Sequence, residues 1–375
     1  MYNGCTSALT INVRHATHLL LISFSLSLSL SSQYPDPFGK VLAYMSFFSL
    51  DFLSIECFAN ADAEQRYYQT VILYSVAPLL GALAIVASCG LRLFLTAVLN
   101  PRAGVKGANA IKSQHLWLFL LLTYVVLPPV AMKQLQALDC LEFPHDGSKL
   151  LRVDTSVDCN SATYQSFKQT TLLFVAIYQL IPMLWLRLLW ARKEQLNPKV
   201  SQMDPGLGLY IREKDVSLRS LRFLFDSYRC SNWWFEVVEM YRRMVFVSAV
   251  PLVSSAPAKR ASLGCVLAIA SLVFYRESSP FNTKFINLIA YVAQLAIFLT
   301  FYAALCIETG KMIDFGLKDT GMGLFLMGIC GTILLMTIGF GVLTIRADRK
   351  ERAALVARAM ALEYAAEVPT TRISL

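Results

Sequence analysis

Apolar segments long enough to cross a lipid bilayer recur along this sequence, and short charged stretches separate them. A helical bundle accommodates this pattern, because backbone groups in lipid must find their hydrogen-bond partners within a helix. The first clear segment covers residues 70–95, and the last covers residues 322–345. Hydrophobic residues make up 56% of the 375, and the mean hydropathy is +0.51, which a soluble core of this size could not hide. The sequence therefore predicts an all-α polytopic membrane protein.

We predict seven to eight transmembrane helices. The seven clear spans are residues 70–95, 116–132, 171–190, 241–253, 262–275, 285–305 and 322–345. An eighth apolar segment follows residue 33 and carries Asp51 near its middle. A lone acid there is typical either of an ion path or of a solvated interfacial or re-entrant segment, and both alternatives stay open.

The chain divides into three regions. Residues 1–32 contain an alternating Ser/Leu run, which fits a signal peptide, a half span or the edge of an incomplete gene model. Residues 33–346 form the transmembrane domain. Residues 347–375 form a tail whose composition predicts a cytoplasmic helix.

The distribution of charge predicts the orientation. The net charge of +9 would suggest a nucleic-acid ligand in a soluble protein, but here basic loops facing anionic lipid account for it. Membrane lipids are therefore the expected partners, and nucleic acid is not. Residues 100–114, 191–231 and 346–358 are rich in Lys and Arg, and seven spans place them on one side, which the positive-inside rule makes cytoplasmic. Lys259 and Arg260 fall on the other side, as an exception.

The nine cysteines contain no CxxC pair, so no metal site is predicted from them. Cys140 and Cys159 flank a polar loop on the predicted non-cytoplasmic side, where an oxidising environment permits a disulfide. We expect these two to pair, and closure of the loop would stabilise the fold by about 3 kcal/mol. Cys57 lies on the same predicted side and is a rival partner.

A charged, aromatic stretch begins at residue 222 and leads directly into apolar sequence. On a helix, Glu236, Glu239 and Arg243 share one stripe, with Glu239 spaced to pair with Arg243, and apolar and aromatic residues occupy the opposite face. This pattern predicts an amphipathic helix at the cytoplasmic membrane interface, which either anchors the bundle or gates it. The candidate gating collar comprises Trp233, Trp234, Glu236, Glu239, Arg242 and Arg243.

Three uncharged polar residues, Asn287, Tyr291 and Gln294, share one face of the span at 285–305. Such side chains either hydrogen-bond a neighbouring helix or line a wet path. If the chain forms a pore, this face is the first candidate for it.

Two blocks carry a resemblance to the transmembrane region of transient-receptor-potential-like (TRP-like) proteins. One contains LDCLEF and LRVDTSVDCNSATYQSF, and the other contains FLFDSYRCSNWWFEVVEMYRRM and FYRESSPFNTKFINLIAYVAQLAIFLTFYAAL. The sequence resembles most the membrane region of repeat-bearing surface proteins of algae, diatoms and oomycetes, and is more distantly similar to fungal TRP-like flavin carriers. The resemblance covers about residues 38 to 310; it does not include the expected ectodomain.

The resemblance implies a multi-pass protein of the plasma membrane or an endomembrane that conducts or regulates cation flux, and the channel analogy implies a homo-oligomer. The alternatives are a transporter of flavin or another small solute, and a non-conducting anchor of a surface ectodomain. The sequence contains no HExxH, P-loop or GxSxG motif, so we expect no enzyme, no cofactor and no metal.

Overall fold

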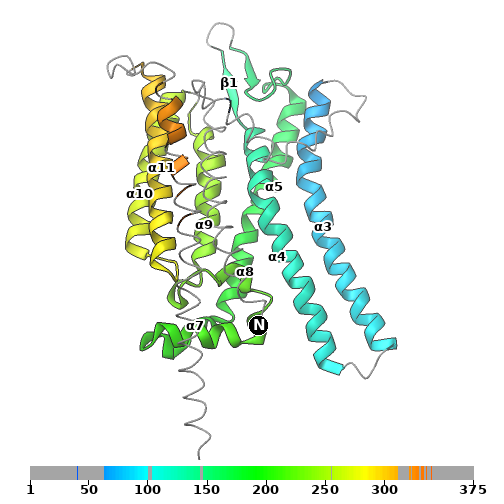
Figure 1. Cartoon of the computed structure of the whole chain (residues 1–375). Helices are drawn as coiled ribbons and strands as arrows, with labels where there is room; N and C mark the ends of the chain where they lie inside the picture. The colour runs from blue at the N-terminus through cyan, green and yellow to red at the C-terminus, as the bar shows by residue number, and fades with distance from the viewer. Residues whose placement is uncertain are drawn as a thin grey trace, which may run out of the picture.

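A computed structural model describes residues 63–99, 104–143, 147–254 and 256–310, together with residue 40 and a few positions between 321 and 339. Long helices lie side by side in a bundle, and a group of short helices lies across one end of it (Figure 1). Five of the described helices are long and apolar enough to cross a membrane. They are α3 (Ala63–Leu99), α4 (Gly104–Gln136), α5 (Ala162–Trp190), α10 (Pro257–Ser278) and α11 (Lys284–Glu308).

The prediction of a helical bundle with membrane-length helices is confirmed, but the count of seven to eight spans is not. Five predicted spans correspond to the five long helices. The predicted span at 241–253 belongs to α9 (Phe235–Met244), a π-helical turn at Val245–Ala249 and a 3-10 turn at Val250–Leu252. Residues 1–39, residues 41–62 with Asp51 and Cys57, and the tail at 347–375 lie outside the described residues, as does most of the last predicted span.

Local sequence signals account for several helix ends. The Ser161 hydroxyl caps α5 by accepting a hydrogen bond from the Tyr164 amide at 3.1 Å. Thr283 caps α11 in the same way. Pro257 begins α10, where its missing N–H costs nothing, and Ser279 ends that helix with a left-handed φ of 36°.

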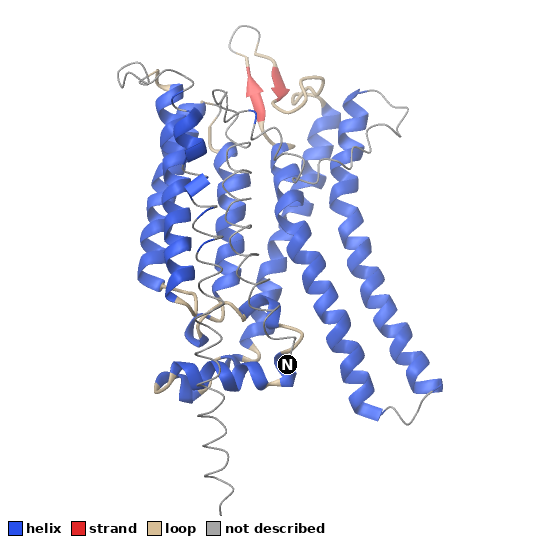
Figure 2. Cartoon of the chain, in the orientation of Figure 1, coloured by secondary structure: helices blue, strands red, loops and turns tan. Residues whose placement is uncertain are grey.

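The long helices form two groups with α9 between them, as Figure 2 shows with the helices in blue. On one side α3 packs on α4, which packs on α5; on the other side α10 packs along α11. The largest core cluster joins the first group to α9 through Leu120, Tyr124, Trp185 and Met240. The helix α9 therefore has its neighbours on both sides of the bundle.

The hydrophilic segment at 191–231, expected as a loop, folds into short helices, which we call the platform. They are α6 (Lys193–Leu196), η4 (Lys199–Gln202), α7 (Pro205–Lys214), η5 (Val216–Leu218), α8 (Arg222–Phe225) and η6 (Cys230–Asn232). Pro205 begins α7, and Asp204 caps this helix, because its carboxylate accepts hydrogen bonds from the amides of Gly206 and Leu207. Figure 1 shows α7 lying crosswise to the long helices.

The opposite end of the bundle carries a small antiparallel hairpin. Strands β1 (Cys140–Glu142) and β2 (Lys149–Leu151) pair with Cys140 opposite Leu151. A disulfide joins Cys140 to Cys159, with Cα atoms 6.5 Å apart, as predicted. Cys159 is buried on a cluster that includes Tyr68 of α3 and Phe167 of α5, so the hairpin is packed onto the ends of these helices.

Candidate functional site: a buried charge cluster

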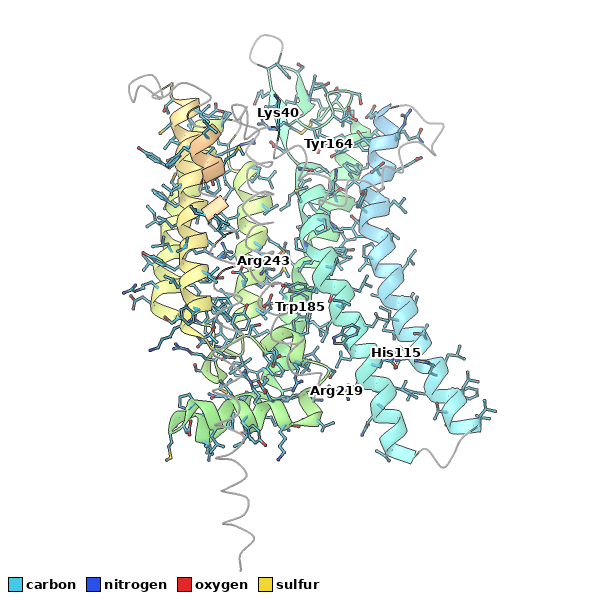
Figure 3. All side chains as sticks on the ribbon, in the orientation of Figure 1. Lys40, His115, Tyr164, Trp185, Arg219 and Arg243 are labelled. Atoms are coloured by element: carbon cyan, nitrogen blue, oxygen red, sulfur yellow. A yellow bond between two sulfur atoms is a disulfide. The ribbon has the colours of Figure 1, made fainter. Side chains whose placement is uncertain are left out.

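The helix α9 carries a cluster of charged side chains inside the bundle. Glu236, Glu239 and Arg243 are only 1%, 3% and 4% exposed. The predicted charged stripe is therefore present, but it faces the protein interior, while Val245 of the apolar face is exposed. Figure 3 shows Arg243 well inside the bundle, between Tyr164 near one end and Arg219 near the other.

The position of α9 differs from the predicted interfacial helix. It runs alongside α4 and α5 and contacts both of them, and α7 is the helix that lies crosswise at the bundle end. The prediction rested on the preference of Trp and Tyr side chains for the headgroup region of a membrane. Here the charges compensate one another, and this allows the stripe to be buried.

Glu239 is the centre of the cluster and accepts hydrogen bonds from three side chains. Arg242 binds both of its carboxylate oxygens, with Nε and Nη2 each 2.8 Å away. The Arg243 Nε lies 3.0 Å from Oε1, and the Tyr275 hydroxyl of α10 donates to Oε2. The carboxylate is therefore saturated with donors, which is the condition under which a buried charge is tolerated.

The two arginines extend the cluster to further helices. Arg243 Nη1 donates to the Tyr124 hydroxyl of α4 at 3.0 Å, and its guanidinium lies 5.8 Å from the centre of that ring. Arg242 Nη1 donates to Gln294 Oε1 of α11 at 3.1 Å. One carboxylate on α9 thus links α4, α10 and α11 through at most one intervening side chain.

The charges on α9 balance in number, because Glu236 and Glu239 are matched by Arg242 and Arg243, although only Glu239 pairs directly with the guanidinium groups. Isolated charge in the interior of an apolar bundle is costly, and ionisable residues there are functional candidates by default. A π-helical turn, Val245–Ala249, follows directly after Met244. Such turns often mark functional sites, since they interrupt the regular hydrogen bonding of a helix.

A second contact joins α9 to the turn between α10 and α11. The Tyr228 hydroxyl donates to Glu236 Oε2 at 2.7 Å, and its ring stacks on Phe281 with centroids 5.2 Å apart. The Arg229 amide donates to the Pro280 carbonyl at 2.9 Å. Burial is the main cause that raises the pKa of Tyr228 well above its usual value, and the negative charge of Glu236 is the second cause. The platform is thereby fixed to the α10–α11 turn.

The two tryptophans of the candidate collar lie beside this contact. Trp233 is buried and meets Trp190 of α5 edge to face, with centroids 5.9 Å apart. Trp234 is partly buried, and its ring lies 5.9 Å from that of Phe235. All six collar residues therefore lie at or next to α9, and the ion pairs among them join Glu239 to Arg242 and Arg243.

The candidate pore face of α11 separates into three environments. Gln294 is fully buried and binds Arg242, so it joins two helices. Asn287 binds the backbone of Phe281 and Thr283 and holds the start of α11. Tyr291 is partly buried. The structure therefore does not bring the three side chains together in one contact.

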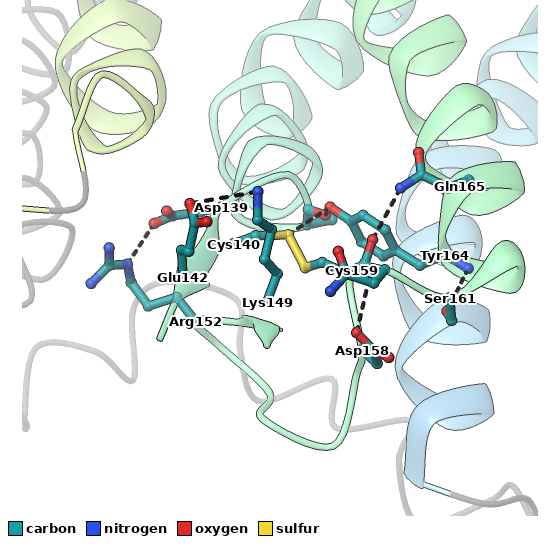
Figure 4. The surroundings of a disulfide bond; sticks show 12 residues. Asp139, Cys140, Glu142, Lys149, Arg152, Asp158, Cys159, Ser161, Tyr164 and Gln165 are labelled. Carbon is teal, nitrogen blue, oxygen red and sulfur yellow. Dashed lines mark hydrogen bonds and ion pairs between the residues drawn. A yellow bond between two sulfur atoms is a disulfide. The ribbon is translucent and has the colours of Figure 1, made fainter. Parts of the chain in front are cut away.

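Asp139 is the centre of a second charge cluster, partly buried at the disulfide end, which the sequence did not indicate as a site. Its carboxylate lies 2.8 Å from Arg152 Nε and 3.2 Å from Arg260 Nη2. Figure 4 shows Asp139, Arg152 and the disulfide together. Arg260 was the exception to the positive-inside pattern, and this basic residue on the wrong side was the available signal of a nearby acid.

Among the residues that the structure describes, no group of three or more His, Cys, Asp or Glu side chains is arranged to hold a metal ion. No protein-family model, curated protein or solved structure matches this chain. The cluster on α9 is thus interpreted from its own geometry.

Proposed function

We propose that this chain is a multi-pass membrane protein that conducts or regulates cation flux, with the Glu239 cluster coupling the platform to the helices. The observation that supports the proposal is the compensated charge cluster buried among apolar helices. The choice of cations follows the TRP-like resemblance of the sequence. Transport of flavin or another small solute, and anchoring of an ectodomain, are the alternatives to be tested beside it.

The coupling has a continuous physical path. Tyr228 and Arg229 bind the platform to the α10–α11 turn, and Tyr228 also binds Glu236 of α9. Three residues beyond Glu236, Glu239 binds α10 directly and, through the two arginines, α4 and α11. A shift of the platform would therefore move α9 and redistribute hydrogen bonds between the helices. Because the cluster is neutral as a whole, it can rearrange without presenting net charge to lipid.

Planar-bilayer recording of the purified chain tests the proposal. The informative variant is Arg243→Gln, which removes one buried charge and its bond to Tyr124. We expect discrete cation currents from the wild type and a change in open probability of about tenfold in the variant, a typical coupling energy. Gln294→Leu removes the hydrogen bond between Arg242 of α9 and Gln294 of α11 but no charge, so the change in open probability should be smaller.

The matched control is Arg219→Gln, which removes the same charge from an exposed position on the platform and should leave the currents unchanged. Correct folding is checked by gel filtration and by retention of the Cys140–Cys159 disulfide. Silence from folded wild-type protein would sink the conduction proposal, and flavin-dependent uptake into proteoliposomes would then favour the transporter. Currents unchanged in Arg243→Gln would remove the cluster from the mechanism.

A further inference from the structure

The disulfide hairpin is connected to α10 by a partly buried acid, Asp139. Asp139 immediately precedes Cys140, and its carboxylate lies between Arg152 of the hairpin loop and Arg260 of α10. The Arg260 Nη2 is 3.3 Å and 3.2 Å from the two carboxylate oxygens. These residues come from parts of the chain that are 121 positions apart, so the ion pair closes a long loop of sequence.

Arg260 occupies an electrostatically unfavourable position. It lies in the first turn of α10, where the helix dipole disfavours positive charge, and it is 1% exposed. Its Nε donates to the Ser254 carbonyl, and Nη1 has no hydrogen-bond partner among the described residues. Asp139 is the acid that forms an ion pair with it in the described part of the chain. The first turn of α10 thus depends on Asp139 for charge compensation.

The position of Asp139 depends in turn on the disulfide hairpin. The Arg152 amide donates to the Asp139 carbonyl at 2.9 Å. Cys140 pairs with Leu151 across the hairpin, and the Cys159 amide donates to the Lys149 carbonyl at 2.7 Å. The disulfide fastens the next residue of the chain to this framework, and Cys140 is itself partly exposed, which allows a reductant to reach the bond.

We propose that the disulfide, Asp139 and Arg260 form a redox-sensitive clasp that holds the first turn of α10 in place. A dithiol reductant attacks one sulfur of the disulfide and forms a mixed disulfide with it, and its second thiol then displaces that cysteine. Two electrons and two protons pass to Cys140 and Cys159, and the reductant becomes a cyclic disulfide. With the hairpin released, Asp139 moves away from Arg260, and α10 loses its charge compensation at that end.

The chain carries a native reporter of this release. Cys265 lies five residues beyond Arg260 on α10, has a free thiol and is 9% exposed. It belongs to the cluster between α10 and α11 that includes Ala261 and Phe301. Loosening of the first turns of α10 would therefore expose its sulfur to a small alkylating reagent.

The experiment measures the rate at which N-ethylmaleimide alkylates Cys265 in the purified full chain, resolved by peptide mass spectrometry. Rates are compared before and after treatment with dithiothreitol, which is removed before alkylation. We expect reduction to accelerate alkylation about fivefold through local opening. Asp139→Asn should give a similar acceleration with the disulfide intact, and reduction of that variant should then add little. Asp139→Glu keeps the charge and should react more slowly than Asp139→Asn.

Asp158→Asn is the matched control, because Asp158 lies in the same loop and, in the described part of the chain, its carboxylate binds the Asn160 amide and no arginine. In this variant, N-ethylmaleimide should alkylate Cys265 at the same rate as in the wild type. Wild-type protein needs no substitution for the reduction arm, so a poorly folded variant would not prevent the test. An unchanged Cys265 rate after verified reduction of Cys140 and Cys159 would overturn the clasp, as would equal acceleration by both asparagine variants.

Discussion

Glu239 and Glu236 lie on the same face of α9, yet their environments differ. Glu239 accepts hydrogen bonds from Arg242, Arg243 and Tyr275, so both of its oxygens are bound. The hydrogen bond of Glu236 in the described part of the chain comes from Tyr228, and its Oε1 has no partner there. The two carboxylates therefore differ in how many of their hydrogen bonds are filled: three side chains donate to Glu239, and one donates to Glu236.

The buried phenol of Tyr228, which donates to Glu236, makes the stability of the folded protein depend on pH. Burial and the neighbouring Glu236 raise its pKa well above 10, so the folded protein retains the phenol as the neutral form. The unfolded chain ionises this tyrosine near its ordinary value of about 10. The contribution of the neutral Tyr228 phenol to the free energy of unfolding is therefore complete below about pH 10. It is lost progressively as the pH rises toward the raised pKa of the folded protein.

We expect Tyr228→Phe to remove this part of the alkaline sensitivity. Thermal unfolding, followed by tryptophan fluorescence at pH 8 and pH 11, should show a smaller loss of melting temperature in the variant than in the wild type. At pH 8 the variant should be less stable by about 1 kcal/mol, because the Glu236 carboxylate loses its donor. Equal losses between the two pH values would contradict the assignment to Tyr228.

At the scale of whole elements, the length of the apolar segments predicted the five long helices that the structure describes. Five helices fall where the apolar segments are, because their length leaves few alternatives in a bilayer. The periodicity of Glu236, Glu239 and Arg243 also predicted their shared face correctly. The direction of that face could not be predicted, since it depends on partners such as Tyr124 and Tyr275 that are distant in sequence.

The platform and the Asp139 cluster were missed for a related reason. A hydrophilic segment with scattered Pro and Gly is typical of a loop, and only contacts such as Tyr228 with Phe281 show that it is fixed in place. The pairing of Asp139 with Arg260 spans 121 residues and follows no local spacing. Sequence patterns report local geometry well, but they do not report which distant segments meet.

The packing of α10 on α11 gives a prediction at this scale. A Cβ atom added at Gly264 would lie 2.1 Å from Cδ1 of Phe301, which is itself buried. Either the Phe301 ring or the two helices would have to shift, so Gly264→Ala should reduce the free energy of unfolding by about 1–3 kcal/mol, the usual cost of overpacking. Thermal or denaturant unfolding in detergent measures this loss.

Gly90→Ala is the control for the substitution itself, because among the described residues no atom outside the glycine's own stretch of α3 lies within 4 Å of the added Cβ. It should be neutral or slightly stabilising, by up to about 1 kcal/mol. Adding Phe301→Leu to Gly264→Ala should recover part of the loss by making room. Equal stability of the two alanine variants would show that the close approach does not limit the packing of α10 on α11.

At the scale of the whole molecule, the two ends of the bundle differ in how their basic residues are compensated. On the platform, Lys193, Lys199 and Arg219 are exposed to solvent. At the disulfide end, Arg152 and Arg260 pair with Asp139, and Lys149 lies 3.5 Å from Glu142. The positive-inside rule counts basic residues near the membrane, and the segment at 191–231 contains many more of them than the exception at Lys259 and Arg260. The platform end is therefore expected on the cytoplasmic side.

Two exposed positions at opposite ends test this orientation. Val153 near the hairpin is 51% exposed, and Met203 on the platform is 92% exposed, so a cysteine at either place should react readily with a maleimide. For a chain in the plasma membrane, an impermeant maleimide should label Val153→Cys in intact cells, but Met203→Cys only after permeabilisation. Peptide mass spectrometry separates these sites from the native thiols, of which Cys230, Cys265 and Cys306 are buried. Labelling of Met203→Cys alone in intact cells would reverse the orientation and place the disulfide in a reducing compartment, where it could not persist.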